Sequence, residues 1–385
     1  MNLELTEEQK LLQRTVREFA ENEVKPLARE LDETGHFPRG TFRKAAELGL
    51  TSVALPESEG GAGFDHISYS IVVEEISRVC ASTGVILSVQ NSLYCDPIHR
   101  FGTAEQKKQF LLPFARGEKI GCYALTEPQA GSNAAALATR AVRKGDRYVI
   151  NGTKAWITNG GVADAALVYV NTDPAKGEKG ITAIVVERGT PGFQVGKEEK
   201  KLGIHATACT ELSFTDCEVP AGNRIGKEGE GYKIALSTLD SGRIGIAAQA
   251  TGIAQGALEQ ALAYAKQRQA FGHPIADFQA IQFMLADMAT EIDAARLLVR
   301  KAAWKQDTGA RFSMEASIAK LFASELATRV THKAIQIHGG YGYSAEYPVE
   351  RMYRDARITE IYEGTSEIQR LVIAAWVLKN YGNHG

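Results

Sequence analysis

A short segment near the end of the first third of the chain, GCYALTEPQAGSNAAAL (121–137), contains residue types that could do chemistry. A strand-like run leads into Thr126, and a Gly131-Ser132-Asn133 turn follows. The small residues of such a turn can leave backbone N–H groups free to hold an anion or a ring carbonyl. The same spacing is also typical of a plain β-turn, so the segment alone leaves both interpretations open.

A second candidate is the carboxylate of Glu363, in the segment RDARITEIYEGTSEIQRL (354–371). Gly364 interrupts a helical pattern, and the spacing of Ser366 and Gln369 predicts that Ser366 caps the helix that follows. We therefore expect Glu363 at a break between two helices, where a carboxylate can take part in acid–base chemistry. An exposed loop carboxylate would show the same pattern.

Other kinds of chemistry find little support in the sequence. The run Gly340-Tyr-Gly342-Tyr-Ser-Ala345 matches a dinucleotide-binding fingerprint, but residues 313–338 before it look helical, whereas that fingerprint follows a strand. The sequence has no G-x-S-x-G nucleophile elbow and no histidines at H-E-x-x-H spacing. We therefore predict neither a nicotinamide fold, nor a serine hydrolase, nor a metal site.

These candidates must be positioned by three successive blocks of secondary structure. Apolar periodicity predicts helices at about 6–33 (bent at Pro26), 39–48, 66–80, 83–100 and 103–116, with capping boxes at Thr6/Gln9 and Thr103/Gln106. Short β-branched runs then predict an antiparallel β domain with strands in 140–158, 165–172, 180–187 and 209–219. From about residue 230 helices return, and a seven-residue apolar repeat over 278–302 predicts a helix-bundle seam.

The sequence thus predicts a multidomain α+β protein with an N-terminal α-helical domain (1–120), a middle β domain (121–230) and a C-terminal helical domain (231–385). No Pro-rich linker separates the blocks, so we expect them to pack closely.

Composition limits the partners. The chain has 44 Lys and Arg against 46 Asp and Glu, so no overall field attracts nucleic acid or an anionic membrane. The five cysteines lack C-x-x-C spacing and are expected to be buried, unpaired residues of a reducing compartment. Acidic residues from Glu4 onward argue against a signal peptide, and no uncharged stretch is long enough to span a membrane. We expect a cytoplasmic protein without membrane insertion, with a mature mitochondrial matrix protein as the alternative.

Six segments together resemble the acyl-CoA dehydrogenase family, in the family's order and over essentially the whole chain. They are YALTEPQAGS (123–132), NGTKAWITN (151–159), TLDSGRIGIA (238–247), AKQRQAFG (265–272), QIHGGYGY (336–343) and YRDARITEIYEGTSEIQR (353–370). The resemblance implies a helical N-terminal domain, an antiparallel β-barrel-like middle domain and a C-terminal four-helix bundle. It also implies FAD-dependent oxidation of an acyl-CoA thioester to the trans-2-enoyl-CoA.

Residue roles follow from the same resemblance. Glu363 would be the base that removes the α-proton, flavin N5 would accept the β-hydride, and the Glu363 amide with a ribityl hydroxyl would bind the thioester oxygen. The expected FAD contacts are Tyr123, Leu125, Thr126, Ser132, Trp156, Thr158, Arg268, Phe271, Gln279, Gln336, Gly339, Gly340, Thr365 and Glu367. The expected substrate contacts are Ser132, Asp240, Arg243 and Gly364.

The resemblance also implies partners. Electrons would pass to an electron-transferring flavoprotein, and residues from Arg268 and the 336–340 run would hold the adenosine end of FAD from a neighbouring subunit. The family norm is a homotetramer, a dimer of dimers.

The chain departs from the family pattern at a few positions. Asn133 replaces a common Asp, which should leave the turn intact. Other branches place the base at the position of Gly242, which has no side chain, so Glu363 is the matching base, with Glu360 one turn earlier as a competitor. Glutaryl-CoA dehydrogenase has an Arg near the position of Gly84, so decarboxylation is disfavoured.

The segments 81–94 and 239–258 most resemble the short-chain, butyryl-CoA branch. Short branched (2-methylbutyryl-type) and medium-chain substrates are alternatives, as is an oxygen-using acyl-CoA oxidase. A non-catalytic binding protein would require loss of the base or of the flavin contacts, and the sequence retains both.

Overall fold

The first third of the chain is helical in the computed structural model, which describes residues 4–380. Its helices are α1 (Glu7–Phe19), α2 (Ala28–Thr34), α3 (Arg39–Glu47), α4 (His66–Ser77), α5 (Ala81–Ser88), α6 (Asp96–Phe101), α7 (Ala104–Gln106) and α8 (Leu112–Ala115). Several are joined by π-helical stretches, at Ala20–Val24, Val89–Cys95 and Lys107–Leu111. The predicted helical ranges are confirmed, although the longest ones are divided.

Two capping boxes begin helices in this region. The Thr6 hydroxyl accepts a hydrogen bond from the Gln9 amide at 3.2 Å, and the Thr103 hydroxyl accepts one from the Gln106 amide at 3.3 Å. Each glutamine side chain accepts a hydrogen bond from the threonine amide in return. Pro26 lies in a 3-10 turn between α1 and α2, because a proline has no amide hydrogen to continue a helix. The predicted caps and bend are confirmed.

An eight-stranded sheet follows the helices. Its strands are β1 (Gly121–Ala124), β2 (Arg140–Lys144), β3 (Arg147–Ile157), β4 (Ala165–Asn171), β5 (Ile181–Glu187), β6 (Phe193–Glu198), β7 (Thr210–Pro220) and β8 (Arg224–Ile225). They lie in the order β6-β7-β3-β2-β4-β5-β8, with β1 beside β4. Most neighbours are antiparallel, as predicted, but β1 and β2 each pair with β4 in parallel. The sheet is therefore mixed, a feature that strand patterns cannot show because they carry no information on the partner's direction.

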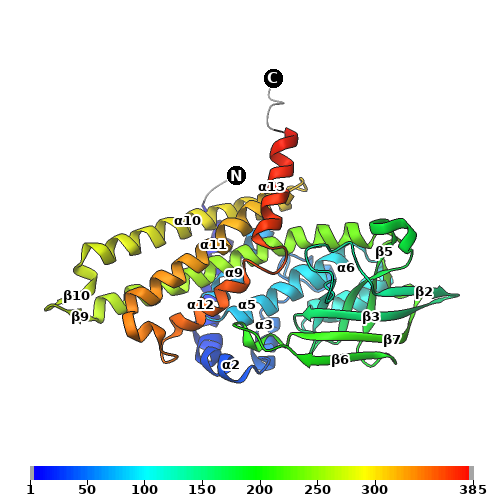
Figure 1. Cartoon of the computed structure of the whole chain (residues 1–385), viewed down its shortest axis with the longest axis horizontal. Helices are drawn as coiled ribbons and strands as arrows, with labels where there is room; N and C mark the ends of the chain where they lie inside the picture. The colour runs from blue at the N-terminus through cyan, green and yellow to red at the C-terminus, as the bar shows by residue number, and fades with distance from the viewer. Residues whose placement is uncertain (1–3, 381–385) are drawn as a thin grey trace.

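Long helices form the C-terminal region (Figure 1). They are α9 (Gly231–Gln267), α10 (Gln279–Asp307), α11 (Ser313–His338), α12 (Pro348–Ile358) and α13 (Ser366–Asn380). The helices α9, α10 and α11 pack against one another along the long axis, and a small hairpin of β9 (Gln269–Ala270) and β10 (His273–Pro274) lies at their far end. A 3-10 helix, not a strand–turn–helix unit, contains Gly340 and Gly342, so the dinucleotide fingerprint is excluded as predicted.

The seven-residue repeat marks the inner face of α10. Its residues Met288, Ile292, Ala295, Val299 and Ala302 are buried. The outer side of the same helix leaves Phe283 64% and Trp304 38% exposed. The predicted bundle seam is confirmed over residues 288–302, whereas Phe278, Ile281 and Leu285 at the start of the repeat are half-buried.

The three blocks share their apolar cores. One cluster joins the N-terminal helices to the bundle, with Val73 of α4 and Ile253 of α9 among its members. Another joins the N-terminal helices to the sheet, where Phe114 and Tyr169 belong to one cluster. The close packing predicted from the absence of linkers is confirmed, whereas the domain boundaries at 120 and 230 stay a proposal.

All five cysteines are buried and free, as predicted. Within residues 4–380, no group of His, Cys, Asp and Glu side chains is arranged to hold a metal ion. Over the same residues, none of the helices combines the length and the apolar character that a membrane-spanning helix requires.

Candidate active site

Glu363 lies at the break between α12 and α13 that the sequence predicts. Its backbone has φ +53°, and Gly364 has φ +94°, so both adopt left-handed conformations. Such a conformation is unusual for a glutamate, and strain of this kind concentrates at functional sites. The helix cap differs from the prediction: the Thr365 hydroxyl accepts from the Ile368 amide at 3.3 Å, whereas the Ser366 hydroxyl is buried without a partner in the described chain.

The Glu363 carboxylate lies against Gly242 of helix α9. Its Oε2 atom is buried and has no hydrogen-bond partner among residues 4–380. A Cβ atom at Gly242 would lie less than 3.0 Å from that oxygen and 2.8 Å from Cδ2 of Leu93. The missing side chain at Gly242 therefore provides the space that the carboxylate occupies.

Burial raises the pKa of Glu363 to about 7, and the positive charges of Lys320 and Arg243 oppose that rise. Arg243 of α9 is held by an ion pair with Asp240 at 2.7 Å, and Asp240 in turn accepts from the Ser313 hydroxyl. The structure thus brings Glu363, Gly364, Asp240 and Arg243 together, and it leaves a carboxyl group that titrates near neutral pH.

A change in pH-dependent stability is the first expected consequence. Because the pKa of Glu363 rises from 4.5 to about 7 on folding, the folded protein binds the proton more tightly than the unfolded chain. That contribution to stability is complete below pH 4.5 and is lost as the pH rises to about 7. Relative to a Glu363→Gln variant, the free energy of unfolding of the wild-type protein should fall by up to about 3 kcal/mol over this interval. It should change little at higher pH.

Melting temperatures of the two proteins between pH 4.5 and 8 would test this expectation. As the pH rises, the melting temperature of the wild-type protein should fall relative to that of the variant. Two melting curves that stay parallel across the interval would contradict the burial of a titrating carboxyl group.

Two side chains secure the Glu363 segment: Lys320, which the sequence interpretation missed, and Gln369, which it named only as part of a helix cap. The Lys320 amine donates to the Gly364 carbonyl at 2.8 Å, and the Gln369 amide group donates to the same oxygen at 2.9 Å. The sequence carries a signal for Lys320, since it lies one turn from the buried Ala316 and Ser324 on the inner stripe of α11. A lysine on such a stripe requires a partner.

A second cluster surrounds the turn after β1. The Thr126 carbonyl accepts from the Ala155 amide at 2.9 Å, which places Thr126 beside Trp156. Lys154 holds this turn in place. Its buried amine donates to the Leu125 carbonyl at 3.0 Å and forms an ion pair with Glu127 at 2.6 Å. Neither Lys154 nor Glu127 was assigned a role from the sequence, although both lie in the quoted motifs.

Trp156 itself has an unusual position. It lies at a bulge in β3, has φ +60° and is 59% exposed. The exposed Ser132 lies in the Gly131–Asn133 turn, and the backbone amides of Ser132 and Asn133 donate to no acceptor within residues 4–380. Thr158, two residues beyond Trp156, is half-buried. The cluster thus presents a flat ring and free hydrogen-bond donors.

Tyr123 connects the two clusters. Its ring packs 5.0 Å from that of Tyr169 in the sheet. Burial raises the pKa of Tyr123 well above its usual value, and the charges of Glu363 and Arg243 also act on it. Tyr123, in β1 just before the turn, is therefore close enough to Glu363 for the two side chains to interact.

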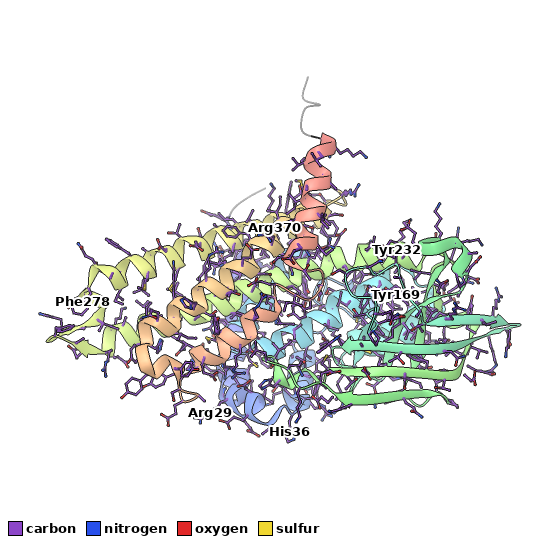
Figure 2. The ribbon with its side chains drawn as sticks, in the orientation of Figure 1. Arg29, His36, Tyr169, Tyr232, Phe278 and Arg370 are labelled. Carbon is purple, nitrogen blue, oxygen red and sulfur yellow. The ribbon has the colours of Figure 1, made fainter. Side chains whose placement is uncertain are left out.

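The remaining predicted contacts form a separate group at the far end of the bundle. Arg268, Gly339 and Gly340 border an open cavity of about 610 Å³, and the Arg268 guanidinium lies 5.6 Å from the Tyr341 ring. Phe271, in the β9–β10 hairpin, is 94% exposed. Gln336 lies in the last turn of α11, just before Ile337 and His338, which line this cavity. Gln279 begins α10 next to the labelled Phe278 (Figure 2).

A single chain does not bring the β9–β10 hairpin next to the sheet. The β9–β10 hairpin and β3 lie at opposite ends of the molecule (Figure 1). Thr365 and Glu367 belong to the Glu363 segment instead, where Glu367 is exposed.

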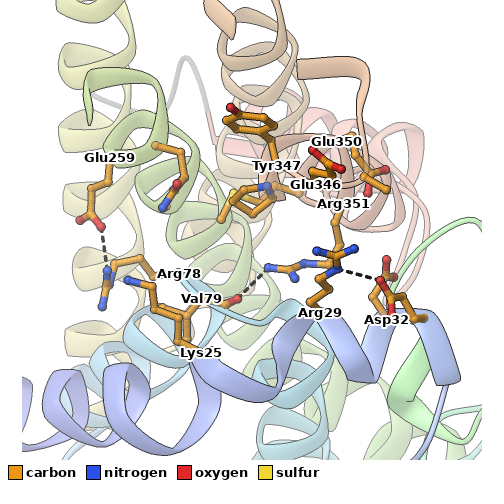
Figure 3. A pocket seen from close by; sticks show the side chains of 16 residues that line it. Lys25, Arg29, Asp32, Arg78, Val79, Glu259, Glu346, Tyr347, Glu350 and Arg351 are labelled. Atoms are coloured by element: carbon orange, nitrogen blue, oxygen red, sulfur yellow. Dashed lines mark hydrogen bonds and ion pairs between the residues drawn. The ribbon is translucent and has the colours of Figure 1, made fainter. Parts of the chain in front are cut away.

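A further cavity of about 230 Å³ is lined by charged residues of α2, α9 and α12 (Figure 3). Arg78 pairs with Glu259 at 2.7 Å, and Arg351 donates to the Val79 carbonyl at 3.1 Å. None of the predicted site residues lines this cavity, so we assign it no part in the candidate site.

Comparison with known proteins covers nearly the whole chain. Three family models match it: Acyl-CoA dehydrogenase, N-terminal domain, at residues 6–118; middle domain, at 122–217; and C-terminal domain, at 229–378. The chain is 54% identical over 379 residues to the short-chain specific acyl-CoA dehydrogenase of Clostridium acetobutylicum, covering 98% of this chain and 100% of that protein.

Two solved structures are similar along their full length. Butyryl-CoA dehydrogenase from Megasphaera elsdenii has a TM-score of 0.97 and 47% identity, covering 98% of this chain and 100% of that one. A chain from a structural study of the electron transferring flavoprotein of Acidaminococcus fermentans, directed towards flavin-based electron bifurcation, has a TM-score of 0.97 and 49% identity. It covers 99% of this chain and 100% of that one.

Proposed function

This chain belongs to the acyl-CoA dehydrogenase family of flavin-dependent oxidoreductases, and we propose that it oxidises short-chain acyl-CoA thioesters to trans-2-enoyl-CoA with FAD. The observation that carries this proposal is the half-buried Glu363, whose Oε2 atom is buried, has no hydrogen-bond partner in residues 4–380 and lies against Gly242. The preference for short chains rests on full-length similarity to the short-chain specific and butyryl-CoA relatives.

The β1 turn and β3 fit a flavin ring. A flavin needs hydrogen-bond donors for its carbonyl oxygens and flat apolar surface beside its ring. The free amides of Ser132 and Asn133 are suitable donors, and the exposed Trp156 ring offers the surface. We assign the ring to Tyr123, Leu125, Thr126, Ser132, Trp156 and Thr158. Bound FAD would supply the acceptor for the β-hydride.

The side chains around Glu363 suit removal of an α-proton. The Cα–H bond breaks, its proton passes to the Glu363 carboxylate, and its electron pair forms the new double bond as hydride leaves the β-carbon. A pKa near 7 makes Glu363 a stronger base than an ordinary carboxylate while leaving a large share ionised at neutral pH. We assign the thioester oxygen to the Glu363 amide, which donates to no acceptor in residues 4–380.

The group at the far end of the bundle suggests a shared cofactor site. We propose that Arg268, Phe271, Gln279, Gln336, Gly339 and Gly340 bind the pyrophosphate and adenosine of a neighbouring subunit's FAD, with Thr365 and Glu367 completing the site. An arginine suits a pyrophosphate because its guanidinium supplies paired charged donors. The exposed apolar residues Leu371 and Leu378 of α13, 65% and 85% exposed, offer further surface for a homotetramer.

Replacing Arg268 with Ala should weaken FAD retention more than acyl-CoA affinity. The reason is that Arg268 follows the last residue of α9 and borders the open cavity, about 37 Å along that helix from Arg243, which we assign to the substrate. Flavin release during dilution and acyl-CoA titration would measure the two effects. If acyl-CoA affinity fell more than FAD retention, Arg268 would have been assigned to the wrong ligand.

Substrate length can be tested by anaerobic titration with butyryl-, octanoyl-, isovaleryl-, 2-methylbutyryl- and glutaryl-CoA. We expect the flavin band to bleach fastest with butyryl-CoA. Rapid bleaching only with octanoyl- or 2-methylbutyryl-CoA would establish the medium-chain or branched-chain alternative. A distal-carboxylate contact at Gly84 has no room, because a Cβ there would overlap Ser77 of α4.

We propose electron-transferring flavoprotein as the electron acceptor, because the chain resembles a chain from the electron transferring flavoprotein study. Stoichiometric peroxide formation during turnover would favour the acyl-CoA oxidase alternative instead. A homotetramer and a cytoplasmic location stay predictions.

A further inference from the structure

A buried lysine contacts the backbone of the residue that follows the candidate base. Lys320 of α11 has no exposed surface, and its amine donates to the Gly364 carbonyl at 2.8 Å. Burying a cation is costly, and here burial lowers the pKa of Lys320 to about 7 while the Glu363 charge opposes that shift. A lysine kept at such a place against its desolvation cost is a candidate for a role in the site.

We propose that Lys320 is a positioning residue for Glu363: its amine fixes the Gly364 carbonyl, and its positive charge favours the carboxylate form of the base. This inference deepens the proposed function and rests on Glu363 acting as that base.

The anchoring part follows from the backbone geometry. Glu363 and Gly364 are both left-handed, a pair of conformations at which the chain changes direction between α12 and α13 (Figure 1). Two donors, from Lys320 and Gln369, converge on the single carbonyl oxygen of Gly364. The next carbonyl back, that of Glu363, also accepts from Gln369 at 3.3 Å. These bonds hold the turn that directs the Glu363 side chain to Gly242.

The electrostatic part follows from the charged groups around the amine. Besides Glu363, the groups that act on Lys320 are Arg243 of α9, and Glu360 and Glu367 beside the break. Arg243 is paired with Asp240, Glu360 with Arg357 at 2.7 Å, and Glu367 is exposed. Glu363 is the carboxylate among them whose Oε2 atom is buried without a partner in residues 4–380, so the charge of Lys320 acts chiefly on it.

The pH profile of anaerobic flavin reduction by butyryl-CoA separates the charge from the anchor. Lys320→Met removes both the charge and the bond, whereas Gln369→Met removes a neutral donor to the same carbonyl. On the acidic side of the profile, the rate of flavin reduction rises with pH as Glu363 loses its proton; we call this rise the acidic limb. In Lys320→Met the acidic limb should lie about one pH unit higher, so that the rate at pH 7 is about fivefold lower than in wild type. Near pH 9 the two rates should be equal. In Gln369→Met the limb should stay in place, with any loss uniform across pH.

Lys333→Met provides a control on the same helix. Lys333 is half-buried, pairs with Asp287 at 3.3 Å and is outside the proposed site, so its profile should match wild type. Lys320→Gln keeps a hydrogen-bond donor but removes the charge, so it should shift the acidic limb as Lys320→Met does. It tests the charge even if Lys320→Met does not fold. An unmoved limb in the Lys320 variants, or an equal movement in Gln369→Met, would overturn the proposal.

A second readout does not depend on turnover. Melting temperatures of wild type, Lys320→Met, Glu363→Gln and the double variant at pH 7 form a double-mutant cycle. If the charges of Lys320 and Glu363 are coupled, the melting-temperature change of the double variant should differ from the sum of the two single changes. Additive changes would overturn the proposed effect of the Lys320 charge on Glu363. Failure of the proposed function is recognised separately, because then the wild-type flavin would not be reduced by any acyl-CoA.

Discussion

Glu363→Gln is expected to keep the fold and bound FAD while slowing flavin reduction by butyryl-CoA by about 100- to 10,000-fold or more. Loss of a general base alone accounts for a factor of this size. We expect a loss at or above the upper end of this range, because Gly242, on the facing helix, offers no second carboxylate. Anaerobic stopped-flow reduction of the flavin band measures the effect, with FAD content and melting temperature as checks on folding.

Glu360→Gln is the matched control for this experiment. Glu360 is one turn earlier, but its carboxylate is occupied by the Thr328 hydroxyl at 2.5 Å and by Arg357. We expect its reduction rate to stay within a few-fold of wild type. Near-normal reduction by Glu363→Gln, together with a large loss in Glu360→Gln, would assign the base to Glu360 instead.

Gly242→Ala is expected to lower the reduction rate by about 10- to 100-fold without unfolding the protein. The new methyl group would overlap Oε2 of Glu363, and the flexible side chain would move away from its present place. Displacing a reacting group by about 1 Å can cost about 100-fold in rate. Stopped-flow reduction and melting temperature, measured on the same preparation, separate the lost rate from lost stability.

Two glycines supply controls for this substitution. At Gly252 of the same helix an added Cβ would overlap the backbone carbonyl of Glu74, so Gly252→Ala should lower the melting temperature instead of affecting the base. At Gly40 of α3 nothing lies within 4 Å of an added Cβ, and Gly40→Ala should be neutral. A Gly242→Ala protein that reduces its flavin at the wild-type rate would show that the carboxylate does not need this space.

Local features of the fold were predictable because they depend on neighbours in sequence. The capping box at Thr6 and the bend at Pro26 need only a few adjacent residues, and both are present. The parallel pairing of β1 with β4 was not predictable, because it depends on how the chain enters the sheet from α8. The sequence predicted Ser366 as the helix cap, one residue after the observed cap, Thr365. Both residue types are good caps, and the left-handed conformation of Gly364 decides between them.

The candidate site divides in the same way. The break that exposes the Glu363 backbone follows from Gly364, and so it was predictable. Whether the carboxylate lies in solvent or in a buried place depends on Gly242 and Lys320, which are more than forty residues away in sequence and meet it only in the folded chain. Residue roles in flavin and substrate binding came from the family resemblance, and they stay proposals.

The most direct test of the account is a single anaerobic turnover of the FAD-saturated protein with butyryl-CoA, following the flavin band and the thioester product together. We predict that the band bleaches as one equivalent of trans-2-enoyl-CoA forms per flavin, at a rate that falls below about pH 7 as Glu363 becomes protonated. A flavin that stays oxidised in the presence of butyryl-CoA and every other acyl-CoA of the panel would contradict it.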